Sequence, residues 1–399
     1  MQYRKDPKSG NQLSVLGFGL MRLPRGITGT DLEKTTALVA QAIAGGVNYF
    51  DTAYVYPGSE VAFGRALETL SLGDPGLRDR IYLATKLPHQ QCRKYEDFDR
   101  IFFEQLNRLK TDRVDYYLIH NLPSPHYWQK LVGLGVEGWI EEKKASGLIG
   151  LAGFSFHGKQ DDFLQLLDMY PWDFCQIQYN YLDTNYQAGL VGMQAAHARQ
   201  MMVVIMEPLR GGKLANGLPQ RALALLKAAE PETSAAAWAL RWIWDQEEPT
   251  VVLSGMNAAE QLQDNLKTAM DAEPGMLSAE QKHMIGQVVS IVEGSYKIAC
   301  TGCNYCMPCP DGVNIPDCFA AYNTRAANGF IAGVSQYMTG IASPHPERYS
   351  GPGRCRACGN CEKKCPQNLA IIESLKQVKR TMEPWWYKPA MAVMRRVMG

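Results

Sequence analysis

The 399-residue sequence predicts an α/β protein: a (β/α)8 or TIM barrel followed by a smaller, helical, cysteine-rich domain. Three observations support this prediction. Apolar runs of strand length recur eight times through residues 13–256, helical patterns separate them, and nine of the eleven cysteines lie between residues 300 and 365. Eight strand–helix units in roughly 260 residues are typical of a (β/α)8 barrel, and a doubly wound open sheet is the alternative.

The predicted strands are nearly continuously apolar, as expected of parallel strands that are buried on both faces. No G-x-G-x-x-G motif opens a helix, because Arg22 occupies the third glycine position after Gly17 and Gly19. This argues against the dinucleotide-binding open sheet. The eight predicted strands are residues 13–20, 47–53, 81–87, 114–121, 148–155, 174–180, 202–209 and 250–256.

Helices are predicted between the strands because apolar residues recur there at helical spacing. The first predicted helix ends in Gly45 and Gly46, which suit a C-terminal cap. A further helix over 278–296 is expected to lead out of the barrel. The predicted helices between strands are residues 31–46, 59–70, 95–110, 126–147 and 258–270.

The composition changes along the chain and sets the predicted domain limits. From residue 297 onward cysteine, proline and glycine become frequent, and the last residues are basic, aromatic and rich in methionine. We expect this tail to pack back on the body or to fray, and a docking segment is the alternative. The predicted parts are a barrel (1–275), a connecting helix (276–296), a cysteine-rich domain (297–380) and the tail (381–399).

Charge and hydropathy narrow the class of protein. The net charge of +1 gives no electrostatic reason to expect a nucleic-acid partner. No apolar run approaches the ~20 residues that span a bilayer. The first ten residues, MQYRKDPKSG, lack the apolar segment of a signal peptide. We therefore expect a cytoplasmic protein without a transmembrane segment.

Four candidate catalytic residues end or follow three consecutive predicted strands. Asp51 ends the second strand and Tyr56 follows it, Lys86 ends the third, and His120 ends the fourth. In a (β/α)8 barrel the catalytic groups gather at these C-terminal strand ends. Each residue alone is more often structural, so the prediction depends on all four types occurring together.

These four side chains suit the reduction of a carbonyl group, or the reverse oxidation of an alcohol. A carbonyl carbon accepts hydride when its oxygen is protonated or stabilised as charge builds on it. Tyr56 is the expected general acid, and a neighbouring Lys86 cation would lower the ordinary tyrosine pKa of ~10. Asp51 would pair with Lys86, and His120 would orient the carbonyl oxygen.

The motifs FDTAYVYPGSE (50–60), LATK (83–86) and YLIHN (117–121), on a barrel of this rhythm, resemble the aldo/keto reductase family over residues 13–270. The resemblance implies that the four residues are a catalytic tetrad and that NAD or NADP lies across the barrel mouth. Ser155 and Gln176 would hold the carboxamide, and Met206 would stack on the nicotinamide ring. The other implied cofactor-binding residues are Met21, Arg22, Leu209, Gly211, Lys213, Ser254, Gly255, Met256, Gln261, Asp264 and Asn265.

The sequence departs from the family pattern at three positions. The stacking position is usually aromatic but is Met206 here, and Phe156 replaces an asparagine. The family binds the 2′-phosphate of NADP with a lysine and an arginine, where this sequence has Gly255 and Gln261. A 2′-phosphate usually recruits arginine, so the missing arginine favours NAD over NADP. The choice between the two cofactors stays open.

The cysteines form two runs that suit iron–sulfur clusters. The second run, C-x2-C-x2-C-x3-C-P, matches the bacterial ferredoxin pattern, and the first has one residue fewer before its last cysteine. In two-cluster ferredoxins the fourth cysteine of each run ligates the other run's cluster. This predicts one [4Fe–4S] on Cys300, Cys303, Cys306 and Cys365 and another on Cys355, Cys358, Cys361 and Cys309, with Cys318 as a spare thiol.

Structural zinc is the alternative for the cysteines. The run CTGCNYCMPCPDGVNIP (300–316) is similar to a branch of the aldo/keto reductases that carries a C-terminal ferredoxin-like domain. Two functions therefore remain open. The barrel works as an NAD(P)H-dependent oxidoreductase on a small carbonyl or alcohol substrate, or it serves mainly as a scaffold while the clusters pass electrons to a redox protein partner.

Overall fold

The computed structural model describes residues 1–26, 29–343, 348–387, 389 and 391–393. The chain divides into two compact units, Met1–Leu209 with Ala236–Ser278 and Arg210–Ala235 with Ala279–Gly399. The second unit thus contains residues 210–235, which the sequence analysis placed with the barrel. It also contains residues 279–296, most of the segment expected to connect the two domains.

Eight parallel strands of the first unit close into a barrel in the order β3, β6, β7, β8, β9, β10, β11, β12. The eight predicted strands are confirmed, and closure excludes the open doubly wound sheet. The strands are β3 (Leu16–Gly19), β6 (Tyr49–Asp51), β7 (Tyr82–Leu87), β8 (Val114–Ile119), β9 (Ile149–Phe156), β10 (Phe174–Gln178), β11 (Met202–Met206) and β12 (Pro249–Ser254).

Strand side chains alternate between two apolar layers. On β11, Met202 and Val204 belong to the cluster inside the barrel, while Val203 and Ile205 pack in the layer under the helices. This alternation follows from the two-residue period of a strand. The interior is filled by side chains, with the Tyr49 and Tyr116 rings 5.2 Å apart, so the barrel is a packed core and not a pore.

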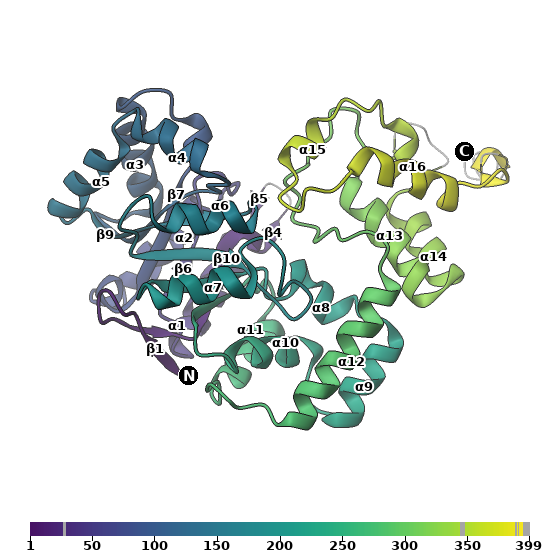
Figure 1. Ribbon diagram of the computed structural model, residues 1–399, viewed down its shortest axis with the longest axis horizontal. Helices are drawn as coiled ribbons and strands as arrows, with labels where there is room; N and C mark the ends of the chain where they lie inside the picture. Colours follow the sequence, from purple (N-terminus) through teal and green to yellow (C-terminus); the bar gives the residue numbers. More distant parts are fainter. Residues whose placement is uncertain (27–28, 344–347, 388, 390, 394–399) are drawn as a thin grey trace. The chain divides into compact units, whose positions relative to one another are not determined.

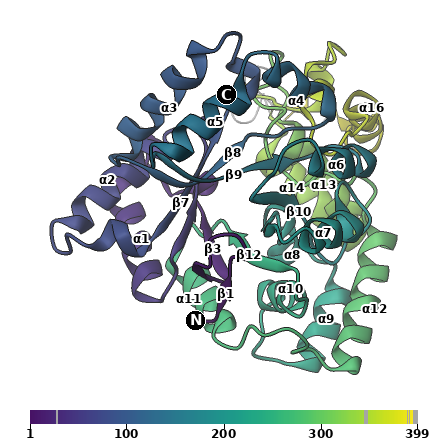
Figure 2. The ribbon, with the colours of Figure 1, turned by 60° about the vertical axis from the view of Figure 1, so that its left-hand side comes forward.

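Helices of the first unit surround the strands, and Figure 2 shows α1, α2 and α3 outside β7 and β8. The predicted helix over 126–147 is two helices, because Gly135 adopts a positive φ of 90° between them. The helices are α1 (Leu32–Ala44), α2 (Ser59–Ser71), α3 (Glu96–Leu109), α4 (Pro125–Val132), α5 (Val136–Ala145), α6 (Gln160–Leu167), α7 (Gly189–Ala198), α10 (Ala235–Trp244) and α11 (Ala259–Ala269), with 3-10 turns η1 (Leu20–Arg22), η2 (Leu77–Arg80) and η3 (His89–Gln91).

Two small hairpins flank the first barrel strand. Strand β1 (Tyr3–Lys5) pairs with β2 (Gln12–Ser14), and β4 (Arg25–Gly26) pairs with β5 (Gly29–Thr30). The predicted strand over 13–20 therefore began too early. Leu13 is apolar because it joins the cluster inside the barrel, although its backbone belongs to the hairpin.

The second unit is helical over the described residues and has its own apolar core. Its helices α13, α14 and α16 lie side by side (Figure 1) and bury Phe319, Tyr337 and Leu375. No helix in the described ranges is long and apolar enough to cross a membrane. The elements are η4 (Arg210–Gly212), α8 (Lys213–Asn216), α9 (Gln220–Ala229), α12 (Ala279–Ser295), α13 (Ile315–Asn328), α14 (Phe330–Gly340), η5 (Pro352–Arg354), α15 (Asn360–Lys364) and α16 (Ile371–Met382).

The predicted tail is described only in part, since residues 388, 390 and 394–399 lie outside the described residues. Tyr387 is buried, and its ring centroid lies 6.3 Å from that of Tyr337. Trp385 is 89% exposed. The described part of the tail thus both packs on the core and presents an aromatic ring to solvent.

Candidate functional site

A buried ion pair lies at the C-terminal end of the barrel. The ammonium of Lys86, on β7, contacts both carboxylate oxygens of Asp51 at 2.6 and 2.7 Å and donates to the Thr52 carbonyl at 2.7 Å. Both side chains are almost fully buried. Because three oxygens surround Lys86, its charge is compensated and its position is fixed.

Tyr56 and His120 complete the group of four. The Lys86 ammonium lies 5.3 Å from the centroid of the Tyr56 ring. The Tyr56 and His120 rings meet edge to face with centroids 5.7 Å apart. Tyr56 is partly exposed, whereas the other three side chains are buried. The structure thus brings the four predicted catalytic residues together; their catalytic roles stay a prediction.

Burial and charge shift the pKa values of these groups. Burial raises the pKa of Asp51 and lowers the pKa of Lys86, and the attraction between the two charges opposes both shifts. Burial, together with the Lys86 cation, holds the pKa of His120 well below its ordinary value. His120 is therefore a neutral imidazole at pH 7, which can donate one hydrogen bond from its ring.

A second buried network supports Lys86 from behind, and the sequence analysis missed it. Glu60, near the start of α2, accepts hydrogen bonds from Thr85 at 2.7 Å and from Gln105 at 2.8 Å. Gln105 also donates to the Lys86 carbonyl at 3.1 Å, and Arg108 pairs with Glu60 at 3.1 Å. Glu60 lies within the FDTAYVYPGSE motif, but its partners come from β7 and α3, so the sequence carried no signal for this network.

Of the two residues expected to hold a nicotinamide carboxamide, Gln176 contacts the ion pair and Ser155 contacts the residue after His120. Gln176 donates to Asp51 Oδ2 at 3.1 Å, and the Ser155 hydroxyl oxygen accepts the Asn121 N–H at 2.7 Å. These bonds use the amide nitrogen of Gln176 and an oxygen lone pair of Ser155. The Gln176 carbonyl and the Ser155 O–H can therefore serve a carboxamide, which needs one acceptor and one donor.

The residues expected at the adenosine end gather where β12 meets β3. Ser254 accepts a hydrogen bond from Asn265 at 2.8 Å, and Arg22 lies beside Gly255, with side-chain carbons 3.8 Å from where a Cβ would stand. Met256 is buried in the barrel core, with 1% of its surface exposed. The remaining predicted residues in this region are Met21, Gln261 and Asp264, all partly or largely exposed.

The predicted residues after β11 fall on both sides of the boundary between the units. Met206 ends β11, and Leu209 is the last residue of the first unit before Gly211 and Lys213 enter the second. Lys213 donates to the carbonyl of Cys300, and Arg210 donates to that of Ala299 at 3.3 Å. Within the second unit, the segment after β11 therefore touches the first cysteine run.

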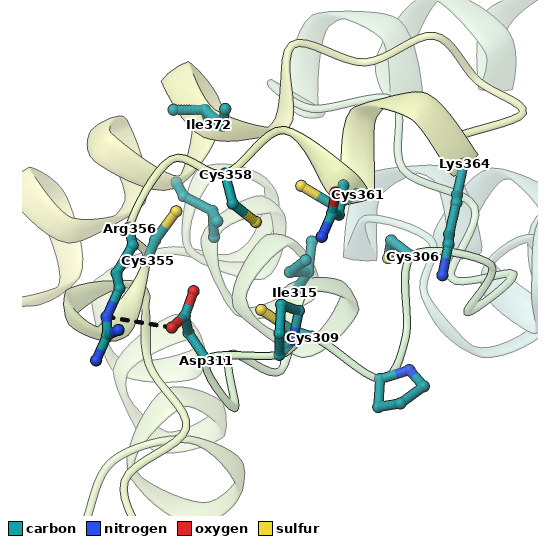
Figure 3. A pocket seen from close by; sticks show the side chains of 14 residues that line it. Cys306, Cys309, Asp311, Ile315, Cys355, Arg356, Cys358, Cys361, Lys364 and Ile372 are labelled. Atoms are coloured by element: carbon teal, nitrogen blue, oxygen red, sulfur yellow. Dashed lines mark ion pairs between the residues drawn. The ribbon is translucent and has the colours of Figure 1, made fainter.

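The eight predicted cluster cysteines border two cavities. One cavity of about 330 Å³ is lined by Cys309, Cys355, Cys358 and Cys361 (Figure 3). The other, of about 20 Å³, is lined by Cys300, Cys303, Cys306 and Cys365. Cys306 also reaches the first cavity. The fourth cysteine of each run thus lies with the other run, as the predicted pairing requires, and ligation itself stays a prediction.

The side chains around these cavities fit iron–sulfur clusters. Cysteine sulfur is the donor that such clusters require; four cysteines line the smaller cavity and five the larger, because Cys306 borders both. Thr301 lines the smaller cavity, is buried, and has a hydroxyl without a hydrogen-bond partner among the described residues. A cluster sulfur would accept that hydroxyl. Cys318, the spare thiol, is fully buried on α13, where burial raises its pKa.

Comparison with known proteins assigns both parts of the chain to families. The Aldo/keto reductase family matches residues 15–281, and the 4Fe-4S dicluster domain matches residues 299–378. The second match favours iron–sulfur clusters over the zinc alternative. An aldo-keto reductase of Mycobacterium sp. (strain KMS) is 34% identical over 111 residues, which are 28% of this chain and 36% of that protein.

A D-galacturonate reductase of Fragaria ananassa is 34% identical over 109 residues, which are 27% of this chain and 32% of that protein. The chain thus spans about a third of the length of these relatives. Among solved structures, an aldo-keto reductase from Bacillus halodurans (holo form) is 25% identical with a TM-score of 0.58, covering 72% of this chain and 96% of that one. An aldo-keto reductase from Klebsiella pneumoniae in complex with NADPH is 21% identical with a TM-score of 0.59, covering 72% and 95%, and shows the fold alone.

Proposed function

This chain belongs to the aldo/keto reductase family and carries a C-terminal 4Fe-4S domain, and from that premise we propose that it is a cytoplasmic NAD(P)H-dependent carbonyl reductase with two [4Fe–4S] clusters. The reverse reaction would oxidise an alcohol. The observation that carries the proposal is the convergence of Asp51, Tyr56, Lys86 and His120 at the barrel mouth.

A bound nicotinamide dinucleotide would supply hydride, and the residues named above would hold it. Tyr56 would donate its hydroxyl proton to the carbonyl oxygen. The Lys86 cation would stabilise the phenolate that remains, because it lies 5.3 Å from the centroid of that ring. Asp51 compensates the lysine charge, and neutral His120 would orient the carbonyl oxygen through a hydrogen bond.

The choice between NAD and NADP is left to experiment. Gly255 and Gln261 lack the charge that a 2′-phosphate recruits. Arg22 carries a positive charge, however, and its Cβ and Cδ lie 3.8 Å from where a Cβ of residue 255 would stand. The Klebsiella pneumoniae structure holds NADPH, so NADPH is tested beside NADH.

The second candidate function is electron exchange between the clusters and a redox partner. The contact that favours it lies within the second unit, where Lys213 and Arg210 bind the backbone at Cys300 and Ala299. Lys213, which the family resemblance places near the pyrophosphate, thus contacts the backbone of a cysteine expected to ligate iron. If the protein exchanges electrons only between its clusters and a redox partner, the barrel would act as a scaffold with little carbonyl turnover.

Anaerobic stopped-flow mixing with NADH and then with NADPH tests the proposal. The purified protein should contain roughly eight iron and eight labile sulfide atoms if both sites are filled. We expect oxidation of the nicotinamide in the presence of a test aldehyde. Loss of cluster absorbance on the same timescale would favour the second candidate, and failure to oxidise either nicotinamide with any of a panel of aldehydes and ketones would contradict the reductase.

The lowered pKa of His120 gives a separate prediction. Because its pKa is held well below 6.5, His120 should stay neutral as the pH falls from 8 to 6. We therefore expect the pH profile of kcat/KM for carbonyl reduction to show no inflection near pH 6.5 from this residue. A loss of activity centred near pH 6.5 that disappears in His120→Gln would contradict the expectation.

A further inference from the structure

The two cysteine runs differ sharply in the charge of their own residues. Residues 300–309 contain no charged side chain. Residues 354–364 contain four basic side chains, Arg354, Arg356, Lys363 and Lys364, and the single acid Glu362. The segment around the second run is therefore strongly basic, although the net charge of the whole chain is only +1.

All four basic side chains are exposed, and two of them stand at the larger cysteine-lined cavity. Arg356 and Lys364 both line this cavity, and Figure 3 shows them on two sides of it. Arg356 is 83% exposed although it pairs with Asp311 at 3.2 Å. Arg354, Lys363 and Lys364 are also exposed, whereas Glu362 is half-buried and accepts the Ile372 N–H at 2.9 Å. The charges that the rim exposes are thus positive, because Asp311 is largely buried beside Arg356 and Glu362 accepts a backbone N–H.

The larger cavity is lined by a cysteine that reaches solvent. Cys358 is exposed, and it is the only exposed cysteine among the described residues. Among the described residues, no charged side chain lines the smaller cavity. A cluster at Cys309, Cys355, Cys358 and Cys361 would therefore lie near the surface, where a partner protein could approach it.

We propose that this basic rim is the docking surface of an acidic one-electron carrier protein, which exchanges electrons at the Cys309, Cys355, Cys358 and Cys361 site. The inference rests on one part of the proposed function, the presence of a cluster at this site, and does not require carbonyl reduction. The carrier loses one electron and the cluster gains it, so no proton or atom is transferred. Opposite charges on the two surfaces would attract and orient the partners and raise the association rate.

Electron-transfer kinetics test the proposal on the intact chain with its clusters loaded. The donors would be a reduced acidic ferredoxin and the methyl viologen radical cation, and the signal would be the bleaching of cluster absorbance. We expect the rate with ferredoxin to fall roughly tenfold or more between low salt and 0.5 M salt. The rate with the viologen cation should stay level or rise, because salt screens repulsion from the same rim.

The variant Lys363→Glu/Lys364→Glu reverses two exposed charges and keeps the Arg356–Asp311 pair. It should accept electrons from ferredoxin at least about tenfold more slowly at low salt while reduction by viologen is unchanged or faster. The control Arg221→Glu/Lys227→Glu makes the same charge change on α9, away from α15 within the same unit (Figure 1), and should behave like the parent chain.

Two results would overturn the proposal: equal rates for the rim variant and the control, or slower reduction of the rim variant by both donors. The second would indicate a changed cluster potential instead of lost docking. Iron and sulfide content and the EPR spectrum of each variant confirm that the clusters are present. None of these measurements needs a carbonyl substrate, so failure of the reductase proposal would be seen separately.

Discussion

Replacement of Tyr56 by phenylalanine is expected to lower kcat/KM for carbonyl reduction by about 10²–10⁴-fold, the range that general acid catalysis contributes. Phenylalanine keeps the ring that meets His120 edge to face, but it has no proton to give. Binding of the nicotinamide dinucleotide should stay within about twofold of the parent, since the hydroxyl is assigned to the substrate oxygen.

Tyr54→Phe is the matched control for this change. Tyr54 lies two residues away in the same segment, and its hydroxyl donates to Glu104 at 2.8 Å, on the outer helix α3. Its removal should leave kcat/KM within a few-fold of the parent. Turnover by Tyr56→Phe at the rate of the parent chain would refute the assignment of the general acid, and equal losses in the two variants would indicate a structural effect.

Replacement of Lys86 by methionine should be the most damaging single change for stability at the site. It leaves the Asp51 carboxylate buried without its cation, and breaking a buried pair in this way typically costs about 3–5 kcal/mol. Activity should fall as well, because the cation beside Tyr56 is lost. The measurements are the thermal unfolding of the barrel and the rate of carbonyl reduction.

Two further variants separate stability from catalysis. Asp51→Asn/Lys86→Met removes both charges and should recover much of the lost stability but none of the activity. Lys143→Met breaks another ion pair of a buried lysine, 2.8 Å from Asp99 on the outside of the barrel, and should leave the activity unchanged. An active Lys86→Met variant would contradict the role given to the lysine.

Barrel and tetrad could be predicted because their signals are local. Each barrel strand is an apolar run, and Asp51, Lys86 and His120 each stand where such a run ends. Once the strands close into a barrel, their C-terminal ends meet at one mouth, so sequence position alone brings these residues together. The cysteine runs could be recognised for the same reason, because the cysteines of each run are separated by only two or three residues.

Partners distant in sequence could not be predicted. Glu60 is supported by Thr85 and Gln105, which lie 25 and 45 positions away. Lys213 is separated by 87 positions from Cys300, and the family pattern pointed it toward the pyrophosphate instead. The break in the predicted helix at 126–147 could not be predicted either, because it depends on the backbone conformation of Gly135.

The sequence by itself therefore determined the barrel, the four residues at its mouth and the two cysteine runs, because periodicity and spacing encode them directly. Only the tertiary structure decided which buried groups support Lys86, that residues 210–235 join the helical unit, and that Arg356 and Lys364 line the larger cysteine cavity. These features depend on which side chains meet across long separations in the chain, and that is determined by packing of the whole molecule.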